Sequence, residues 1–169
     1  MCRRTLTEKV ICIYTYFMDN RSELPDLARC REIADVCTLL NVRKASRVVS
    51  DLYDQAFRPL GIRGTQFSLL VALALGENAT LGELADTLVL DRTTLTRNLG
   101  PLERDGLVAS APGDDRRERR LRLTPVGRRT LAKAIRAWEG AQRQVRDRLG
   151  EARVTELTSG LKAVVSLAG

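Results

Sequence analysis

The sequence predicts a mainly helical fold that also contains one small β-hairpin, an α+β protein. Three observations support this prediction. Long stretches at both ends repeat apolar residues every three to four positions, two short helical patterns lie in the middle, and two short alternating stretches flank a turn sequence, Pro112-Gly113-Asp114-Asp115. The 169 residues, 44% of them hydrophobic, suffice for one domain with extended arms.

The N-terminal part is expected to consist of an arm, residues 1–24, followed by a long helix. Met18 looks like a second natural start, so residues 1–17 are either a poorly ordered tail or an arm that packs on a dimer. We favour the tail, because chain termini are often unconstrained. A helix is predicted from Pro25 or Asp26 to about Phe57, and its apolar stripe is too long for one small lobe to bury.

The next segment, residues 62–124, is expected to form a separate lobe. Pro59 and Gly61 end the long helix, and a very apolar helix from Gln66 to about Leu75 should form the floor of the lobe. Thr80 then opens a short helix, with Glu83 three positions later to complete a capping box.

Asp91 is the predicted N-cap of a second short helix, the arrangement of a helix-turn-helix. Gly100-Pro101 lies inside this helix and should bend it, unless the helix ends before that point. The polar residues near its beginning carry hydroxyl, amide and guanidinium groups, which read base edges and hold phosphates. These candidates are Arg92, Thr93, Thr94, Thr96, Arg97 and Asn98.

Asp105-Gly106 should end this helix, and a hairpin follows in which Leu121 and Leu123 alternate with arginines. A helix-turn-helix followed by such a hairpin is a winged helix-turn-helix. Guanidinium groups at the tip of the wing could enter a narrow minor groove. The hairpin carries Arg116, Arg117, Arg119, Arg120 and Arg122, and we predict that the first three contact DNA.

Residues 125–169 are expected to form two further helices. Thr124 is a candidate cap with Pro125 at the first helical position, Gly150 stops the first helix, and a last helix should run from about Glu151 to Leu167. Apolar helices after a complete lobe are best explained by burial between subunits. We therefore expect residues 25–58 and 125–169 to form the interface of a symmetric homodimer.

The chain resembles the MarR family of bacterial transcriptional regulators from about Ala45 to about Ala134. The resemblance is carried by Leu84-Ala85-Asp86, Leu90 to Thr96, Leu102 to Val108, Asp114-Asp115-Arg116-Arg117, and Leu123 to Gly127. It implies that Asp91 pairs with Arg117, that Asp115 braces the wing, and that the protein is a dimer. It also implies a small aromatic or phenolic effector in the crevice beside the lobe, with Arg43, Arg47, Tyr53 and Trp138 as possible wall residues. Structural roles fit these four positions equally well.

The four cysteines, Cys2, Cys12, Cys30 and Cys37, all precede residue 40. Without a histidine or a Cys-x-x-Cys pair, a zinc site within one chain is not expected, and we predict no cofactor. Some relatives of the resembled family sense peroxide through a cysteine near the first helix, which suggests Cys37 or Cys30 as a redox site. The alternative is that each is a small apolar residue.

The net charge of +7 and a pI near 9.7 point to an acidic partner. Ten arginines and six acidic residues lie between Asp91 and Arg129, so the excess charge is concentrated on the winged segment. The low aromatic content of 4% disfavours single strands, and no apolar run reaches membrane-spanning length. We expect a cytoplasmic protein that binds double-stranded DNA.

The predicted function is sequence-specific transcriptional regulation, as a repressor on a pseudo-palindromic operator. The alternative is a non-specific architectural DNA-binding protein, which would rely mainly on phosphate contacts. An enzyme is not expected, because the sequence has no histidine, no glycine-rich phosphate loop and no nucleophile motif.

Overall fold

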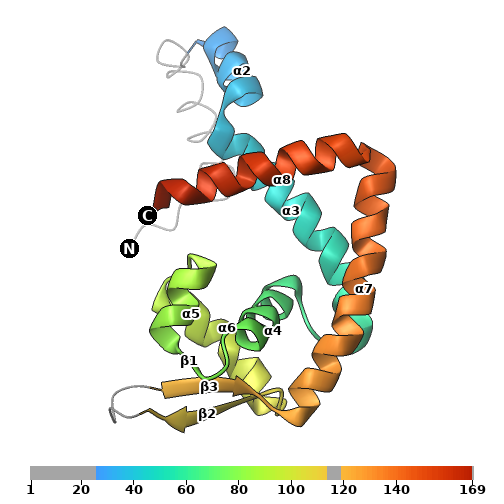
Figure 1. The fold of residues 1–169 in the computed structure, drawn as a ribbon. Coiled ribbons are helices and arrows are strands. Elements are labelled where there is room, and N and C mark those ends of the chain that lie inside the picture. The colour runs from blue at the N-terminus through green and yellow to red at the C-terminus, as the bar shows by residue number, and fades with distance from the viewer. Residues whose placement is uncertain (1–25, 114–118, 169) are drawn as a thin grey trace, which may run out of the picture. The chain divides into compact units, whose positions relative to one another are not determined.

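The computed structural model describes residues 26–113 and 119–168, which form helices and one three-stranded antiparallel sheet (Figure 1). The chain divides into two compact units, residues 1–47 and residues 48–169. The predicted fold class, mainly α with a small β-hairpin wing, is confirmed.

The first unit contains helix α2, Leu27–Val36, and the beginning of helix α3, Thr38–Phe57. The side chain of Asp26 caps α2 by accepting a hydrogen bond from the Ala28 N–H at 2.8 Å. None of the residues of α2 is buried.

The prediction of one uninterrupted helix from Pro25 to Phe57 is wrong, because the helix breaks at Cys37, where ψ is 111°. The amide of Asn41 stabilises the break by donating to the carbonyls of Asp35 and Cys37, both at 3.0 Å. Neither glycine nor proline marks the position, and the apolar spacing continues across it, so the pattern alone suggested a continuous helix.

In the second unit, α3 ends in a single 3₁₀ turn, η2, Arg58–Leu60, followed by Gly61 at φ 70°. Helix α4, Gly64–Leu75, begins two residues before the predicted Gln66. Its first N–H, from Gly64, donates to Oδ1 of Asp54 at 2.6 Å, which ties the start of α4 to α3. Helix α4 packs against α5, α6, α7 and strand β3, as expected for the floor of the lobe.

The helix-turn-helix consists of α5, Leu81–Leu88, and α6, Arg92–Arg104. Helix α6 continues through Pro101, so the alternative in which it ends earlier is wrong. Gly106 follows it at φ 68°, as the sequence predicted for the exit of this helix.

The sheet contains β1, Ala79–Thr80, β2, Val108–Pro112, and β3, Arg119–Leu123, in the order β1-β3-β2. Leu123 lies opposite Val108, and Leu121 lies opposite both Ser110 and Ala79. Strand β1 was not predicted, because two residues are too few to show an alternating pattern. The predicted turn residues Asp114 and Asp115 lie outside the described residues.

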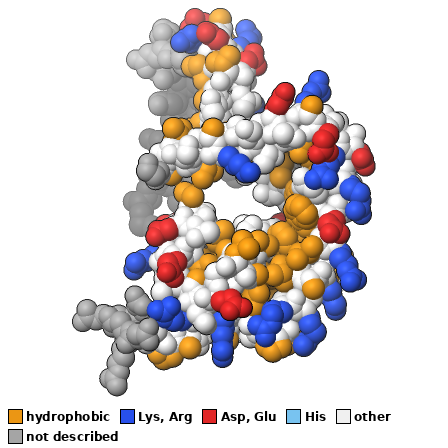
Figure 2. Space-filling model, viewed as in Figure 1, with side chains coloured by type: hydrophobic (Ala, Val, Ile, Leu, Met, Phe, Trp, Pro, Cys, Tyr) orange, Lys and Arg blue, Asp and Glu red, His pale blue; other side chains and the backbone are white. Residues whose placement is uncertain are grey.

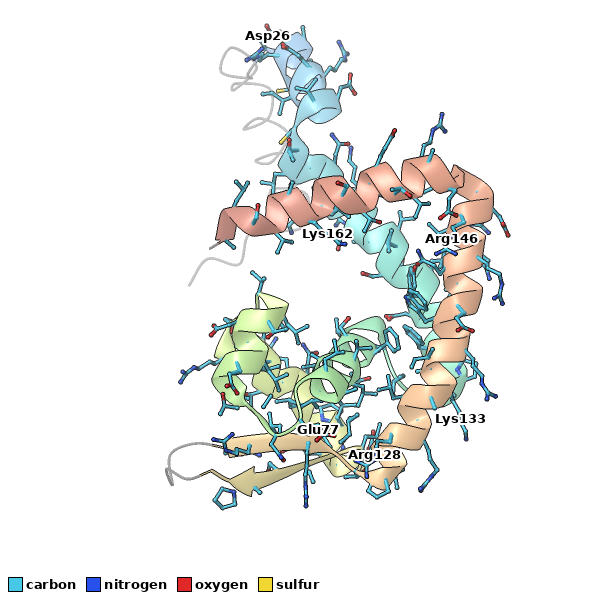
Figure 3. All side chains as sticks on the ribbon, viewed as in Figure 1. Asp26, Glu77, Arg128, Lys133, Arg146 and Lys162 are labelled. Carbon is cyan, nitrogen blue, oxygen red and sulfur yellow. The ribbon has the colours of Figure 1, made fainter. Side chains whose placement is uncertain are left out.

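The chain continues into α7, Pro125–Leu149, then α8, Glu151–Val165, and a last 3₁₀ turn, η3, Ser166–Ala168. As predicted, Thr124 caps α7 by accepting from the Gly127 N–H at 2.9 Å, and Gly150 ends this helix at φ 84°. Figure 3 shows Arg128 at the corner between β3 and α7, where its Nη1 donates to the Leu123 carbonyl at 3.1 Å.

The core of the second unit lies between α4, the helix-turn-helix, the sheet and the first turns of α7. Its largest fully buried side chains are Phe57, Leu69, Leu70, Leu73, Leu84, Leu95, Leu102 and Leu121. Among the described residues, no helix is both long and apolar enough to span a membrane.

Candidate nucleic-acid interface

Helix α6 is held in the lobe by three leucines and by a side-chain cap at its start. Leu95, Leu99 and Leu102 are at most 3% exposed, so this face of the helix is fixed against the core. Asp91 accepts from the Thr94 N–H at 2.8 Å and from the Thr94 hydroxyl at 2.6 Å. The hydrogen bonds from Thr94, with that of the side chain first, lower the pKa of Asp91.

The opposite face of α6 carries the predicted DNA-contacting residues and is open to solvent. Arg92, Thr93, Thr96 and Arg97 are exposed, and Asn98 is half-buried beside them. The Thr96 hydroxyl donates to the Arg92 carbonyl at 2.8 Å, so it remains available mainly as an acceptor. The structure therefore leaves two cationic and two hydroxyl side chains of α6 exposed, with the Asn98 amide at the edge of this surface. Their contact with DNA stays a prediction.

Helix α5 supports α6 and begins with the predicted capping box. The Thr80 N–H donates to Glu83 Oε2 at 2.7 Å, and the Glu83 N–H donates to Thr80 Oγ1 at 3.2 Å. The Thr80 hydroxyl also donates to Glu83 Oε2, at 3.0 Å. The hydrogen bonds that this carboxylate accepts from the Thr80 N–H and, second, from the Thr80 hydroxyl lower the pKa of Glu83. The turn between α5 and α6 contains Val89 at φ 51°, a left-handed conformation that is unusual for a β-branched residue.

Arg119, one of the predicted DNA contacts, connects the wing to α6. Its Nη2 donates to Glu103 Oε1 at 2.7 Å and to Ser110 Oγ at 2.9 Å. Its guanidinium group therefore fixes β3 to the C-terminal part of α6, a role that sequence reasoning did not foresee. Arg120 donates to the Asn78 carbonyl at 3.3 Å, while Arg122 is exposed.

The remaining wing predictions fall on Asp115, Arg116 and Arg117, which lie outside the described residues. The predicted pair between Asp91 and Arg117 and the bracing role of Asp115 therefore stay predictions. In the view of Figure 2, Lys and Arg side chains gather along the lower edge of the lobe.

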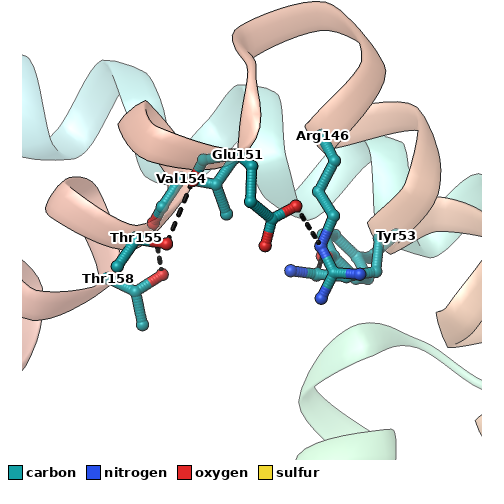
Figure 4. Close-up of polar contacts among 7 residues, drawn as sticks. Tyr53, Arg146, Glu151, Val154, Thr155 and Thr158 are labelled. Carbon is teal, nitrogen blue, oxygen red and sulfur yellow. Dashed lines mark hydrogen bonds and ion pairs between the residues drawn. The ribbon is translucent and has the colours of Figure 1, made fainter.

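The predicted wall residues of an effector site are divided between the two units. Arg43 and Arg47 are exposed on α3 in the first unit. Tyr53 and Trp138 pack, partly buried, against the core of the second unit. The Tyr53 hydroxyl donates to Gln142 Oε1. Burial raises the pKa of Tyr53, and the charge of Arg146, drawn with Tyr53 in Figure 4, opposes this shift more weakly. Tyr53 and Trp138 thus have structural contacts of their own.

The cysteines within the described residues are both free thiols. Cys30 is exposed on α2, and Cys37 is half-buried at the break between α2 and α3. Cys2 and Cys12 lie outside the described residues. In residues 26–113 and 119–168, no group of three or more Cys, Asp or Glu side chains is arranged to hold a metal ion.

Sequence reasoning missed one set of residues beside α6. Arg58, Arg63 and Arg104 line the same groove as Arg97 and Asn98. Arg58 and Arg63 precede α4 and are far from α6 in the sequence, so no local motif indicated that they would lie beside it.

Comparison with known proteins identifies the fold and the family. The sequence model of the MarR family matches residues 60–118. The transcriptional regulator MosR from M. tuberculosis, solved in complex with DNA, is 39% identical, with a TM-score of 0.68; the match covers 78% of this chain and 98% of MosR. A search of curated proteins finds no match.

Two structures of the regulator CouR are similar to the chain. The transcriptional repressor CouR bound to a 23-mer DNA duplex is 26% identical with a TM-score of 0.72, covering 78% of this chain and 94% of CouR. CouR from Rhodococcus jostii RHA1 bound to p-coumaroyl-CoA is 20% identical with a TM-score of 0.67, covering 78% and 93%, and shows likeness of fold alone.

The identity to MosR extends over nearly the whole of that regulator, and the family match covers the helix-turn-helix and β2. Members of the matched family regulate transcription and are not enzymes. The resemblance predicted from the sequence is confirmed: the chain belongs to the MarR family of DNA-binding transcriptional regulators.

Proposed function

We propose that the protein is a sequence-specific repressor that binds a pseudo-palindromic operator as a homodimer. The observation that carries this proposal is the exposed surface of α6, where Arg92 and Arg97 are open to solvent and Asn98 lies at the edge, while Leu95, Leu99 and Leu102 fix the other face in the core. Arginine and asparagine form bidentate hydrogen bonds with guanine and adenine edges, so this face suits base reading as well as phosphate binding.

The repressor assignment draws on CouR, which is a transcriptional repressor solved on a DNA duplex. A repressor needs only to occupy its operator, and the proposed interface provides for that. The predicted wing contacts of Arg116 and Arg117 complete the proposal. We also propose that the protein acts in the cytoplasm, where it would meet duplex DNA.

The homodimer is supported by apolar helix faces that the described residues leave uncovered. In α8 only Val154 is buried, while Leu157 and Leu161 are 46% and 44% exposed. The second copy would cover these side chains, and a two-fold axis would place two α6 helices about one helical turn of DNA apart.

We further propose that DNA binding responds to a small aromatic or phenolic ligand, or to oxidation of Cys30 or Cys37. CouR has been solved with p-coumaroyl-CoA, a ligand with a phenolic group, which supports the first alternative. The exposure of Cys30 makes its thiol accessible to oxidants, which supports the second. A panel of aromatic acids and peroxide, screened by thermal stability and DNA release, distinguishes them.

Selection from a pool of random duplexes tests the central proposal. We expect enrichment of one inverted repeat with half-sites about 10 base pairs apart. Equal retention of all sequences would instead support a non-specific architectural protein and overturn the proposed base reading.

Arg97→Ala tests whether α6 reads bases. The variant should lose about 1–3 kcal/mol of discrimination at one operator position per half-site, because a bidentate hydrogen bond to a base disappears. Arg136→Ala, at an exposed position of α7, removes the same charge and serves as the control. Equal losses on operator and scrambled duplexes would mean that Arg97 touches only phosphate.

A further inference from the structure

A groove of about 700 Å³ runs beside α6, between this helix and the segment that leads into α4. One wall comes from residues 54–66, including the end of α3, η2 and the first turn of α4. The other wall comes from residues 97–105 of α6 and its exit. The groove therefore joins the proposed reading helix to a part of the lobe outside the helix-turn-helix.

Four arginines line this groove: Arg58 and Arg63 on one wall, Arg97 and Arg104 on the other. Within the described residues, Arg58, Arg63 and Arg97 form no ion pair, and Arg104 approaches only its neighbour Asp105, at 3.9 Å. Four guanidinium groups against two carboxylates leave the lining of the groove with a net positive charge, which attracts an anion.

The two carboxylates of the groove offset only half of the charge of its four arginines. Asp54 accepts a hydrogen bond from the Gly64 N–H at 2.6 Å, so its carboxylate is engaged at the start of α4. Asp105 lies at the exit of α6 beside Arg104. Thr65 and Gln66, in the first turn of α4, add a hydroxyl and an amide to the same wall.

We propose that this groove, which we call the flanking groove, binds the phosphate backbone of the DNA strand beside the major groove that α6 enters. This inference rests on the proposed DNA recognition by α6 and extends the contact surface to Arg58 and Arg63. Arg97 lies both on the proposed base-reading surface of α6 and in the flanking groove. When the bases of a duplex face α6, the phosphates of the adjacent strand therefore lie near this groove. A backbone is the fitting occupant, because the arginines come from two walls of the groove and successive phosphates can meet arginines of both walls.

The test compares Arg58→Gln/Arg63→Gln with Arg136→Gln/Arg143→Gln. All four arginines are exposed, and both pairs remove the same charge. Binding is measured on the selected duplex and on a scrambled duplex, over a range of salt concentrations, after circular dichroism has shown that each variant is folded. Binding of the wild-type protein is measured in parallel with inorganic phosphate or a mononucleotide as competitor.

The flanking-groove variant should bind both duplexes more weakly by the same factor. Its plot of log affinity against log salt should be shallower by about 0.9 for each phosphate that the variant no longer neutralises, while the ratio between the duplexes stays unchanged. Arg63→Glu should weaken binding further.

Three results would overturn the proposal for the flanking groove. The two double variants could bind DNA with equal affinity, or the loss of affinity could be confined to the selected duplex. Displacement of DNA by millimolar phosphate or mononucleotide would instead indicate a site for small anions. Failure of the proposed function is distinct, since it appears in the wild-type protein as equal affinity for both duplexes.

Discussion

At the scale of single residues, Val89 and Asp91 fix the turn and the start of α6. Val89 adopts φ 51° at the end of α5. Its side chain is 56% exposed, so little packing compensates for this strained backbone conformation. Asp91, two residues later, holds the first turn of α6 through Thr94. The backbone of Val89 is strained, whereas Asp91 stabilises the N-terminus of α6. Together these two residues determine how α6 is oriented in the lobe.

Val89→Gly should raise the free energy of unfolding by about 0.5–1 kcal/mol. A left-handed backbone costs a residue with a Cβ atom about 1–2 kcal/mol, and glycine removes this cost. Glycine loses more conformational entropy on folding, which offsets about 0.5–1 kcal/mol of the gain. Chemical denaturation measures the change. Thr87→Gly, in the last turn of α5, is the control and should destabilise the protein, because glycine there relieves no strain. A lower stability of Val89→Gly would show that the valine side chain contributes packing that outweighs its strain.

Asp91→Ala should lower the unfolding midpoint at pH 7, because the cap of α6 is removed. The folded-state pKa of Asp91 is lowered, so its stabilisation is complete above the unfolded pKa of about 3.9 and disappears as pH falls through the folded pKa. The difference between wild type and variant should therefore be constant from pH 5 to 8 and shrink below about pH 4. Asp91→Asn, which keeps an acceptor, should show little of this dependence. A difference that persists unchanged at pH 2 would contradict the role of the charged cap.

At the scale of elements, the contact between α7 and Leu107, the residue before β2, depends on one glycine. A Cβ atom at Gly127 would lie 2.0 Å from the Leu107 carbonyl oxygen, so α7 approaches the start of β2 more closely than any side chain permits. The same carbonyl accepts from the Thr124 N–H at 3.0 Å. The first turn of α7 is therefore fixed directly to the backbone of the wing.

Gly127→Ala should destabilise the protein by about 1–3 kcal/mol, because backbone must move apart to admit the methyl group. Gly140→Ala, in the same helix and with no atom within 4 Å of the added Cβ, should instead stabilise by about 0.5–1 kcal/mol. Thermal and chemical unfolding of the two variants measure both effects. Equal stability of Gly127→Ala and wild type would mean that the close approach is dispensable.

Most elements of the second unit were predictable, because their signals are local. Thr80, Asp91 and Thr124 are caps whose chemistry acts within one helical turn, and Gly106 and Gly150 mark helix ends by their backbone freedom. The break at Cys37 was missed because it is stabilised by the Asn41 side chain and leaves the apolar spacing intact.

The candidate site was predictable only in part, for the same reason. The exposed face of α6 follows from helical spacing around three leucines, so its residues could be named in advance. Arg119 was assigned to DNA, yet its guanidinium bonds Glu103, which is 16 residues earlier in the sequence. Arg58 and Arg63 reach the flanking groove through tertiary folding, which no local pattern encodes.

At the scale of the whole molecule, the terminal helices carry more apolar surface than the described residues cover. In α2 no residue is buried, and in α8 only one is. Burying an exposed leucine or valine contributes about 1.5–3 kcal/mol, so a second copy that covers several of them gains a stable interface.

Leu157→Glu/Leu161→Glu should convert the proposed dimer to a monomer at micromolar concentration and abolish cooperative binding to the inverted repeat. The carboxylates would have to be buried in an apolar interface. Sedimentation equilibrium measures the oligomeric state. Ser159→Glu, on the other face of α8, adds the same kind of charge and should leave the dimer intact. A wild-type protein that sediments as a monomer, or a double variant that stays dimeric, would contradict the proposal.

Because Gly127 packs directly against the Leu107 backbone, the first turn of α7 and the wing are expected to move together. At 1.5 Å per residue, the 25 residues of α7 extend about 37 Å, so a tilt of about 5° at the Gly150 end shifts the opposite end by about 3 Å. A displacement of that size equals the length of a hydrogen bond. A small change in tilt at the Gly150 end of α7 would thus displace the wing far enough to break hydrogen bonds that it is predicted to form with DNA.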